Sequence, residues 1–510
     1  MTLDWRKRVE YKLLKWQARF EGTTFDRVFP WICVAFLWII FALLALARSR
    51  ELSQDANLAA VMQSVWLIGE GFTPDASLLG QNYFSLQGGF LIYPITVLTR
   101  IFPTAMTLMI IQAGALALTV VPLWRLSRNV AQLRTGASTT IILVYGVFSA
   151  VHAVNLAGFH LESLALPLLM AAVYSTYVDK SRRYWIFITL VLLARADLGI
   201  AVAGLGILWL LEGKKRIGYQ TLSFGLAWST ILILGVQPLY NAGHFPHVNA
   251  FTGYGGNNPF SIVWGIIIHP WSFVTELFSE PNFLVAVSLL APVLFLPVVA
   301  PRYLIPALPL FSLYLAADVP EGELTEASQT IPITVFIFVA LVFALAKTGS
   351  IVVQRVNVDR AVIGALIFTA TVFFTANSIS SPYEDPWSWG RRDSVDIARL
   401  EVAEMVPKDA VVRASQKLLP LLTERVGLLE FNLPAEYDDR LGGEAVRNVN
   451  WFIFDRSEVP RDWNGVDILD FQADIRVGQR FVQVYSNSGI EAYVTPAVAE
   501  RYGLNPLTND

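Results

Sequence analysis

Two residues of opposite charge, Arg195 and Asp197, stand in the middle of the apolar run 185–211, in the stretch LLARADLGIAV. A charged side chain at the centre of a membrane span costs about 2.5–3.5 kcal/mol on insertion scales, so such residues usually face a cavity, a partner or a substrate path. Basic sequences flank the run on both sides, DKSRR before it and EGKKR after it. Because both ends favour the same side of the membrane, the pattern predicts a hairpin that turns at 194–197, with its tip in a water-filled cavity open to the outside. The alternative is a single helix in which the two charges pair inside a helix bundle.

Further ionisable residues stand beside other apolar runs. His160 and Glu162, in GFHLESLALP, open a predicted span instead of lying in a long loop, so they form either a structural pair or part of a cavity wall. Asp55 precedes apolar residues at helical spacing, which predict a helix over 55–69. Asp55 is therefore either the cap of this helix or a carboxylate aimed into the cavity.

A long loop over 241–281 contains GHFPHVNAFTGYGGNNPF. His244 and His247 are close to the spacing of metal ligands, but Pro246 between them argues against a regular helix. The glycines and asparagines around Tyr254 predict a mobile loop that covers a site. The motif leaves open whether a metal ion is bound.

The composition is that of a membrane protein. The 510 residues are 54% hydrophobic and only 15% charged, whereas soluble domains carry about 25% charged residues. A net charge of −3 argues against a nucleic-acid partner. The single cysteine, Cys33, excludes an intrachain disulfide.

Apolar windows predict a polytopic helical protein with about eleven membrane-crossing segments, if 185–211 contributes two short arms. The segment 83–102 is also apolar, but Gly88, Gly89 and Pro94 interrupt it, so we expect it to lie in the membrane interface. The windows are 30–47, 104–124, 137–154, 162–178, 185–211, 219–240, 282–298, 303–317, 330–349 and 361–378.

The distribution of Lys and Arg sets the orientation, because cytoplasmic loops accumulate positive charge. With the N-terminus inside, the basic residues concentrate in the inside segments, and the outside loops before 379 hold only Arg48, Arg50, Arg100 and Arg195. The C-terminal part is then extracytoplasmic, in a protein of the inner or plasma membrane. The inside segments are the leader, 125–134, 180–183, 214–216, Arg302 and 347–360.

Three domains follow from these patterns. Residues 1–29 form a basic, amphipathic cytoplasmic leader that either lies on the inner leaflet or is solvated. Residues 30–378 form the transmembrane domain. Residues 379–510 lose the long apolar runs and alternate short β-type stretches with helical ones, which predicts a small α/β domain without a nucleotide-binding or hydrolase motif.

The order of these elements resembles the GT-C superfamily of polytopic glycosyltransferases. More narrowly, the chain is similar to a bacterial and archaeal family of predicted membrane proteins of unknown function with a GT-C-like plan. The stretches that carry the resemblance include NLAAVMQSVW, GFHLESLALPLLMAAVY and LLARADLGIAV, and together they lie at 57–66, 90–128, 158–174, 192–202, 289–309, 407–434 and 450–457.

This chain departs from the family pattern at acidic positions. Asn57 stands where the family typically has aspartate, and Asp55 lies two residues earlier. Gly158 opens the triplet that the family typically shows as Asp-Phe-His, and Arg195-Ala196-Asp197 replaces Lys-Glu-Asp. Either Asp55 and Glu162 substitute for the lost acids, or the activity is altered or absent.

The resemblance implies transfer of a sugar from a polyprenyl-phosphate donor to an acceptor at the outer face. It implies Asp55 as the base and Arg195 as the contact to the donor phosphate, since the arginine fork suits phosphate. Asp197, His160 and Glu162 would complete the catalytic wall, by orienting these groups or by binding a divalent cation such as Mg²⁺ or Mn²⁺. The loop with His244, His247 and Tyr254 would be a lid or acceptor loop.

Two other functions use the same cavity. A transporter of lipid or solute would place the buried charges on the substrate path and use 185–211 as a discontinuous helix, although the sequence has no evident internal repeat. A non-catalytic envelope scaffold would account for the lost acidic residues. The sugar, the acceptor and the oligomeric state are not determined by the sequence.

Overall fold

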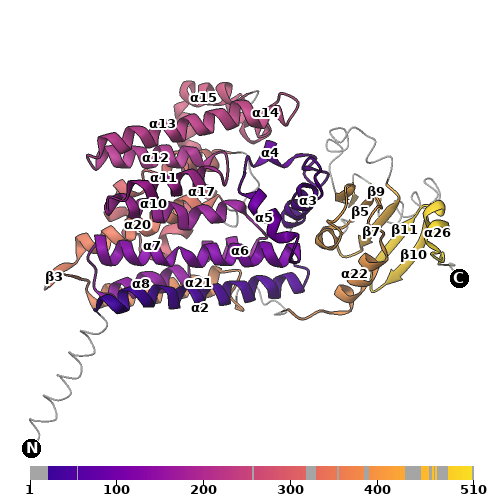
Figure 1. Cartoon of the computed structure of the whole chain (residues 1–510), viewed down its shortest axis with the longest axis horizontal. Helices are drawn as coiled ribbons and strands as arrows, with labels where there is room; N and C mark the ends of the chain where they lie inside the picture. Colours follow the sequence, from indigo (N-terminus) through magenta and orange to yellow (C-terminus); the bar gives the residue numbers. More distant parts are fainter. Residues whose placement is uncertain are drawn as a thin grey trace, which may run out of the picture.

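The structure is a computed structural model, and it describes residues 21–53, 56–255, 258–317, 329–352, 355–383, 390–430, 449–458, 462–463, 466–467 and 481–507. Figure 1 shows a bundle of helices lying side by side, with a mixed sheet at one end of the bundle. The predicted leader falls almost wholly within 1–20 and Asp55 within 54–55, so both lie outside the described residues.

The first half of the bundle consists of long helices joined by short ones near the sheet. The long helix α2 begins at Thr23, before the predicted apolar window, because polar residues supply its first turn. The helices are α2 (Thr23–Arg50), α3 (Ala56–Glu70), α4 (Tyr83–Leu86), α5 (Ile92–Thr99), α6 (Thr104–Leu118), α7 (Val120–Arg125), η1 (Leu126–Val130), α8 (Thr135–Gly146), α9 (Ser149–Leu156), η2 (Leu161–Leu164), α10 (Ala165–Tyr177), α11 (Ser181–Leu192) and α12 (Leu198–Leu211).

The second half contains more interruptions. Prolines at 292, 297 and 306 interrupt two of the predicted apolar windows, and Pro301 begins a 3₁₀ turn between them, because proline lacks the N–H that a continuing helix needs. The elements are α13 (Lys215–Ile231), η3 (Leu232–Val236), α14 (Gln237–Leu239), η4 (Val248–Tyr254), α15 (Pro259–Ile268), α16 (Pro270–Leu277), α17 (Glu280–Leu290), η5 (Ala291–Val293), η6 (Leu296–Val299), η7 (Pro301–Tyr303), α18 (Leu308–Leu315), α20 (Thr330–Thr348) and α21 (Arg360–Asn377).

Six described helices are long and apolar enough to cross a membrane, and one bent pair, Val248–Ile268 with Pro270–Leu277, would make a seventh. The predicted count of about eleven is not confirmed, since several of the predicted windows form helices of 17 residues or fewer, such as Leu161–Tyr177, Leu198–Leu211 and Glu280–Val293. The six are Thr23–Arg50, Thr104–Val130, Thr135–Leu156, Lys215–Leu239, Thr330–Thr348 and Arg360–Asn377.

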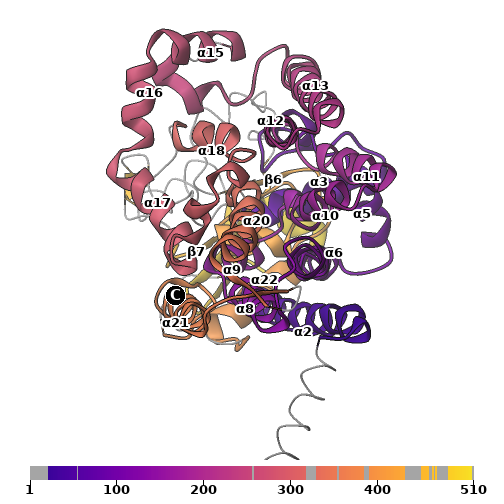
Figure 2. The same ribbon diagram turned by 90° about the vertical axis from the view of Figure 1, so that its left-hand side faces the viewer.

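The helices differ in what their apolar side chains face. Figure 2 looks along the bundle and shows α20 in its middle, and 83% of the apolar window of α20 is buried. By contrast, only 22% of the window of α2 and 11% of that of α21 are buried. Large apolar side chains of α2, among them Ile32, Phe36 and Leu43, are therefore exposed over a wide area, which a membrane would cover.

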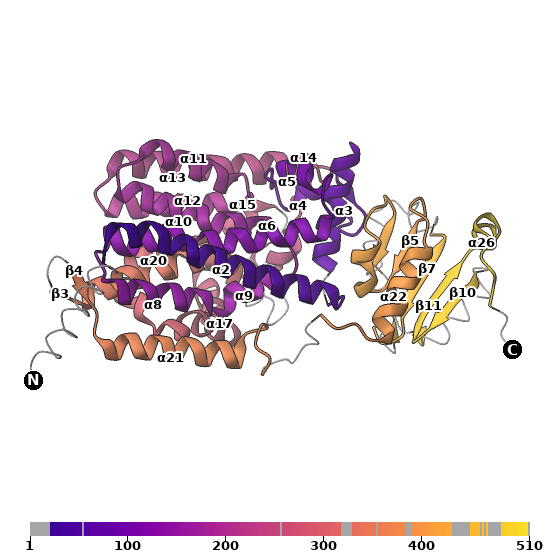
Figure 3. The ribbon, with the colours of Figure 1, turned by 60° about the horizontal axis from the view of Figure 1, so that its bottom comes forward.

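Helix α2 begins at the end of the bundle away from the sheet (Figures 1 and 3), and basic residues make hydrogen bonds and ion pairs near its start. Lys214 Nζ donates a hydrogen bond to the carbonyl oxygen of Thr176 at 2.6 Å, and Arg355 Nη1 donates one to that of Arg128. Arg128 in turn pairs with Asp26 at the start of α2, at 2.7 Å. The two basic sequences that flank the 185–211 run therefore lie at the same end.

The sheet at the other end has the strand order β10-β11-β7-β5-β6. The pairs β5–β6 and β5–β7 are parallel, and β7–β11 and β10–β11 are antiparallel. Strands β7 and β11 are buried along their whole length. The elements here are α22 (Ser394–Met405), β5 (Val412–Ala414), η8 (Gln416–Leu421), β6 (Leu428–Glu430), β7 (Trp451–Asp455), β10 (Val482–Asn487), β11 (Ile490–Val494) and α26 (Pro496–Tyr502).

Among the described residues, three small antiparallel pairs lie outside this sheet. They are β1 (Asp75–Ala76) with β2 (Gln81–Asn82), β3 (Ser350–Val352) with β4 (Arg355–Asn357), and β8 (Asp462–Trp463) with β9 (Val466–Asp467).

Helix α3 joins the bundle to the sheet. Gln63 Nε2 donates hydrogen bonds to the carbonyl oxygens of Arg425 and Val426, each at 3.1 Å. Ser77, just after α3, bonds both backbone groups of Leu428 in β6. The helix predicted over 55–69 is thus packed between the two parts, and it covers the end of the bundle where the predicted site residues lie.

Candidate functional site

Arg195 lies in a sharp turn between two helices, as the hairpin prediction required. Helix α11 ends at Leu192 and α12 begins at Leu198. The backbone of the 83–102 segment holds this turn, because Leu91 N–H donates to the Leu193 carbonyl and Ala196 N–H donates to the Gln87 carbonyl, each at 3.1 Å. The turn is therefore fixed by pairing with a distant segment as well as by its own sequence.

Gly89 allows this close approach. A Cβ at this position would lie 2.5 Å from Leu161 Cδ2 and 2.6 Å from the Ala194 carbonyl oxygen. Both distances are well below van der Waals contact, so only glycine fits. The glycine that interrupts the 83–102 segment in sequence is thus the point where that segment meets the turn.

The Arg195 guanidinium binds three side chains from three parts of the chain. Its Nη1 lies 2.5 Å from Glu162 Oε1, and its Nε lies 2.7 Å from Asp197 Oδ1. Its Nη2 donates to the hydroxyl of Tyr314 in α18, which donates in turn to Asp197 Oδ2 at 2.5 Å. Glu162, Arg195, Asp197 and Tyr314 are called the arginine cluster below.

The arginine cluster is buried and carries two carboxylates for one cation. The side chains of Glu162 and Arg195 are 4% and 10% exposed, whereas that of Asp197 is 28% exposed. Both predictions for the opening residues therefore hold in part: the hairpin turn exists, and Arg195 and Asp197 also pair. Asp197 is the member that reaches solvent.

The cluster does not fit a divalent cation. Arg195 occupies the space between Glu162 and Asp197, so its positive charge already neutralises the carboxylates that would ligate a metal. Among the described residues, no group of three or more His, Cys, Asp or Glu side chains has the arrangement of a metal site.

Two predicted histidines lie beside the cluster. His160 Nδ1 is 4.0 Å from Glu162 Oε1, too long for a hydrogen bond, and its buried Nε2 has no hydrogen-bond partner among the described residues. His247 Nε2 donates to the Leu86 carbonyl at 3.1 Å. Burial lowers the pKa of His247, more than the hydrogen bond to Leu86 raises it, so the ring is neutral at neutral pH.

The other residues of the predicted loop have different environments. His244 lines a polar cavity of about 770 Å³, together with Asp75 and Asn82. Tyr254 instead packs in an apolar cluster with Ile262 and Ala316. Ala316 follows Tyr314 of the arginine cluster by two residues. Tyr254 thus fixes one part of the loop close to the arginine cluster, and His244 in another part lines the polar cavity.

An apolar groove of about 670 Å³ lies elsewhere in the bundle and extends to residues next to the turn. It lies between α2, α6, α10 and α11, and its lining includes Trp38, Leu91 and Leu164. Leu91 is bonded to the turn through Leu193, and Leu164 follows Glu162 by two residues. The apolar groove therefore reaches residues that adjoin the arginine cluster, whereas no residue of the cluster lines the groove or the polar cavity.

Comparison with known proteins assigns this chain to a family. Residues 48–490 match a family described as predicted membrane protein (DUF2079). The chain belongs to this family. No curated protein matches the DUF2079 chain with significant sequence similarity.

Solved structures show the fold of this DUF2079 protein. Apo ArnT from Cupriavidus metallidurans is 10% identical, with a TM-score of 0.53 over 94% of this chain and 100% of that one. The same ArnT bound to undecaprenyl phosphate is also 10% identical, with a TM-score of 0.51 over 92% and 98%. The Archaeoglobus fulgidus oligosaccharyltransferase in complex with Zn and sulfate is 13% identical, with a TM-score of 0.39 over 90% and 73%, too low to carry an argument. The likeness to ArnT confirms the predicted GT-C-like fold.

Sequence reasoning missed two residues of the DUF2079 site. Tyr314 gave no signal, because a tyrosine in an apolar window is ordinary. Gln112 did give one, as a lone amide in the 104–124 window. Its Nε2 donates to the carbonyls of Val154 and Gly158, and its Oε1 accepts from His160 N–H at 2.7 Å. Gln112 therefore holds the backbone that carries His160.

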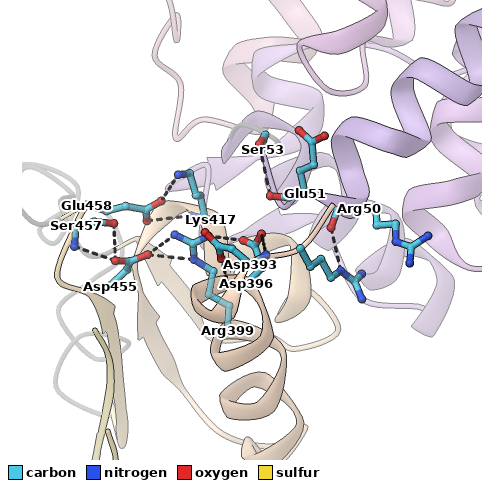
Figure 4. A network of polar contacts seen from close by, with 11 residues as sticks. Arg50, Glu51, Ser53, Asp393, Asp396, Arg399, Lys417, Asp455, Ser457 and Glu458 are labelled. Carbon is cyan, nitrogen blue, oxygen red and sulfur yellow. Dashed lines mark hydrogen bonds and ion pairs between the residues drawn. The ribbon is translucent and has the colours of Figure 1, made fainter. Parts of the chain in front are cut away.

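A second polar network of the DUF2079 chain lies where β5 and β7 end, facing the bundle (Figure 4). Arg399 of α22 donates to Asp455 Oδ2 through Nε at 3.0 Å and also through Nη2. Arg399 Nη1 bonds Asp396 Oδ1 at 2.6 Å, and Lys417 Nζ lies 3.7 Å from Glu458 Oε1. These charges are mutually paired, so the network holds α22 against the sheet.

This network should make the sheet sensitive to acid. Burial opposes ionisation of Asp455, but hydrogen bonds from Ser457 and Arg399 outweigh it and hold the pKa of Asp455 below its ordinary value. Stability from a lowered carboxyl pKa is present above the unfolded-state pKa of about 3.9 and is lost as pH falls through the folded-state pKa. We expect Asp455→Asn to lower the free energy of unfolding of the sheet by about 3 kcal/mol at neutral pH and to flatten its dependence on pH below about 4.

Hydrogen exchange of the β7 amides measures this effect. Asp409→Asn is the matched control, since the side chain of Asp409 is 59% exposed. Equal protection of β7 in wild type and Asp455→Asn at neutral pH would contradict the expectation.

Proposed function

We propose that this protein is a membrane glycosyltransferase that moves a sugar from a polyprenyl-phosphate donor to an acceptor at the outer face of the membrane. The observation that carries the proposal is the buried Arg195, which binds Glu162 and Asp197 in a turn that also bonds Leu91 of the apolar groove. The fold shared with ArnT supports it, and the ArnT structure bound to undecaprenyl phosphate suggests the class of lipid.

The reaction needs a group that stabilises the charge of the leaving phosphate and a group that accepts the proton of the attacking hydroxyl. An acceptor hydroxyl attacks the anomeric carbon, the new glycosidic C–O bond forms, and the bond from that carbon to the donor phosphate oxygen breaks. The hydroxyl proton passes to a carboxylate, for which Asp55 is our candidate. The polyprenyl phosphate leaves with the bonding electron pair, and its negative charge is stabilised by Arg195.

Arg195 must exchange partners to bind the donor. Glu162 is almost fully buried, so it stays bound and orients the guanidinium. Asp197 is 28% exposed and can turn to solvent, so we propose that the donor phosphate displaces Asp197. His160, with its partnerless buried Nε2, and His247 complete the polar wall.

We assign one substrate to each of the two cavities by its polarity. The apolar groove, of about 670 Å³, suits the first isoprene units of the donor tail. The polar cavity, with the Asp75 carboxylate fixed by Asn82 Nδ2 at 2.9 Å, suits a hydroxyl-rich acceptor. The loop with His244, His247 and Tyr254 is then the wall between acceptor and solvent.

The orientation follows from charge. The basic end of the bundle is cytoplasmic, which puts the N-terminus and the leader 1–29 inside. The arginine cluster and the α/β domain over 379–510 are then extracytoplasmic, and 30–378 is the transmembrane domain. We propose the cell membrane, inner membrane where there are two, as the location.

Turnover of a radiolabelled polyprenyl-phosphate sugar by membranes containing the protein tests this function. Wild type should release polyprenyl phosphate in step with a labelled product, and Asp55→Asn should turn over more slowly while it still binds donor. Asp409→Asn, the same change on the sheet surface, should behave as wild type.

Three results would contradict the proposal, the first in its choice of base and the other two in its reaction. Equal turnover by wild type and Asp55→Asn would remove Asp55 as the base. Donor that crosses the bilayer without cleavage would identify a transporter, and wild type that neither binds nor cleaves any donor would favour a scaffold.

A further inference from the structure

A third cavity lies at the opposite end of the bundle, away from the arginine cluster. Its volume is about 630 Å³, and it is formed where α10 ends, α11 begins and α13 begins. Four cationic side chains line it, Lys180, Lys214, Lys215 and Arg216, and we call this cavity the basic pocket. Among the lining residues Asp179 is the single acid.

One of the four cations is built into the fold, and the other three line the opening. Lys214 Nζ donates to the Thr176 carbonyl at 2.6 Å and lies 5.3 Å from the centre of the Tyr177 ring. Asp179 Oδ1 is 3.9 Å from the same Nζ. Lys180, Lys215 and Arg216 are exposed, so the pocket keeps a net positive charge after Asp179 is counted against Lys214.

The backbone adds to this field. Helices α11 and α13, of 12 and 17 residues, both begin at the pocket, and their N-cap residues, Lys180 and Lys214, make no side-chain cap hydrogen bond. The first N–H groups of a helix point along its axis and favour an anion. Cations and helix N-termini from two separate helices therefore converge on one cavity.

The surroundings place the basic pocket at a membrane surface. Trp185 and Tyr184 line it, and Ile186, Leu211 and Tyr219 near the starts of α11 and α13 and the end of α12 are exposed to what surrounds the bundle. A half-buried tryptophan and exposed apolar residues next to cations are typical of the headgroup level. A soluble anion would not need the apolar rim.

We propose that the basic pocket binds the phosphate of an anionic phospholipid from the leaflet on the side opposite the sheet. The phosphate oxygens would take hydrogen bonds from Lys215, Arg216 and the first amides of α13, and the acyl chains would lie along the exposed apolar residues. The same two helices, α11 and α12, carry the turn with Arg195 at their other ends, so bound lipid braces the hairpin that holds the arginine cluster. This site is independent of the proposed sugar transfer.

Binding of labelled phosphatidylglycerol to the purified full-length protein in phosphatidylcholine nanodiscs tests the site. The variant is Lys215→Gln with Arg216→Gln, and the matched control is Arg182→Gln with Arg183→Gln, which removes the same charge from exposed residues outside the pocket lining. At about 1 kcal/mol per cation near a lipid surface, the pocket variant should bind about 30-fold more weakly. The control should lose much less.

Equal losses in both variants would show diffuse attraction to the surface and overturn the pocket. An unchanged affinity in the pocket variant would do the same. Inorganic phosphate that displaces the labelled lipid completely would point to a soluble anion and overturn the lipid assignment. Lys180→Gln, a single exposed change, keeps the test valid if the double variant does not fold.

Discussion

Replacing Arg195 by methionine is expected to lower sugar transfer by about 10³-fold, because the leaving phosphate loses its only buried cationic contact among the described residues. The same change should lower the free energy of unfolding by about 3–5 kcal/mol, since it leaves the buried carboxylate of Glu162 and the partly exposed one of Asp197 without their counter-ion. Turnover of labelled donor and denaturant unfolding in detergent measure the two effects.

The two effects can be separated within the cluster. A triple variant that combines Arg195→Met with Glu162→Gln and Asp197→Asn removes all the buried charge, so its stability should recover much of the loss. Its turnover should stay low. Recovery of both would mean that Arg195 serves stability alone.

Two controls calibrate this prediction. Arg501→Met breaks an ion pair whose arginine side chain is 68% exposed, and it should cost about 0–1 kcal/mol. Arg195→Lys keeps the charge but loses the planar fork that reaches three side chains, so it should retain only part of the turnover. Turnover of Arg195→Met within a few-fold of wild type would contradict the assignment of Arg195 to the donor phosphate.

Gly89→Ala is expected to have the second largest effect, although it adds only one methyl group. The new Cβ would lie 2.5 Å from Leu161 Cδ2 and 2.6 Å from the Ala194 carbonyl oxygen, so the 83–102 segment must move away from the turn. The hydrogen bonds from Leu91 to Leu193 and from Ala196 to Gln87 then lengthen. We expect a stability loss of about 1–3 kcal/mol from overpacking and a fall in turnover of about 10²-fold from misplacement of Arg195.

Gly364→Ala on α21 is the matched control. A Cβ there meets nothing within 4 Å, and alanine favours a helix over glycine by about 1 kcal/mol, so stability should be equal or slightly higher. The readouts are thermal unfolding and donor turnover for both variants. If Gly89→Ala turned over donor like wild type, the contact between the 83–102 segment and the turn would not position Arg195.

Much of the architecture could be predicted from the sequence because it depends on local composition. The break in 185–211 followed from basic sequences on both flanks, and the structure places it between Leu192 and Leu198. The helix predicted over 55–69 is α3, Ala56–Glu70, and the region 379–510, for which short β-type stretches were predicted, contains the short strands β5, β7 and β10. The approach of Glu162 to Arg195 was also expected, since both residues were assigned to the same side of the membrane.

Other features depended on contacts between distant segments. The sequence alone determined that this is a helical membrane protein with a charged hairpin turn, because charge and hydropathy act on each segment separately. Only the tertiary structure decided that Tyr314 completes the arginine cluster, that Gly89 packs against Ala194, and that α20 is central while α2 and α21 are peripheral. An apolar side chain has the same hydropathy whether it meets lipid or protein, and a buried guanidinium donates hydrogen bonds to any suitably placed oxygen, so these choices are made by packing.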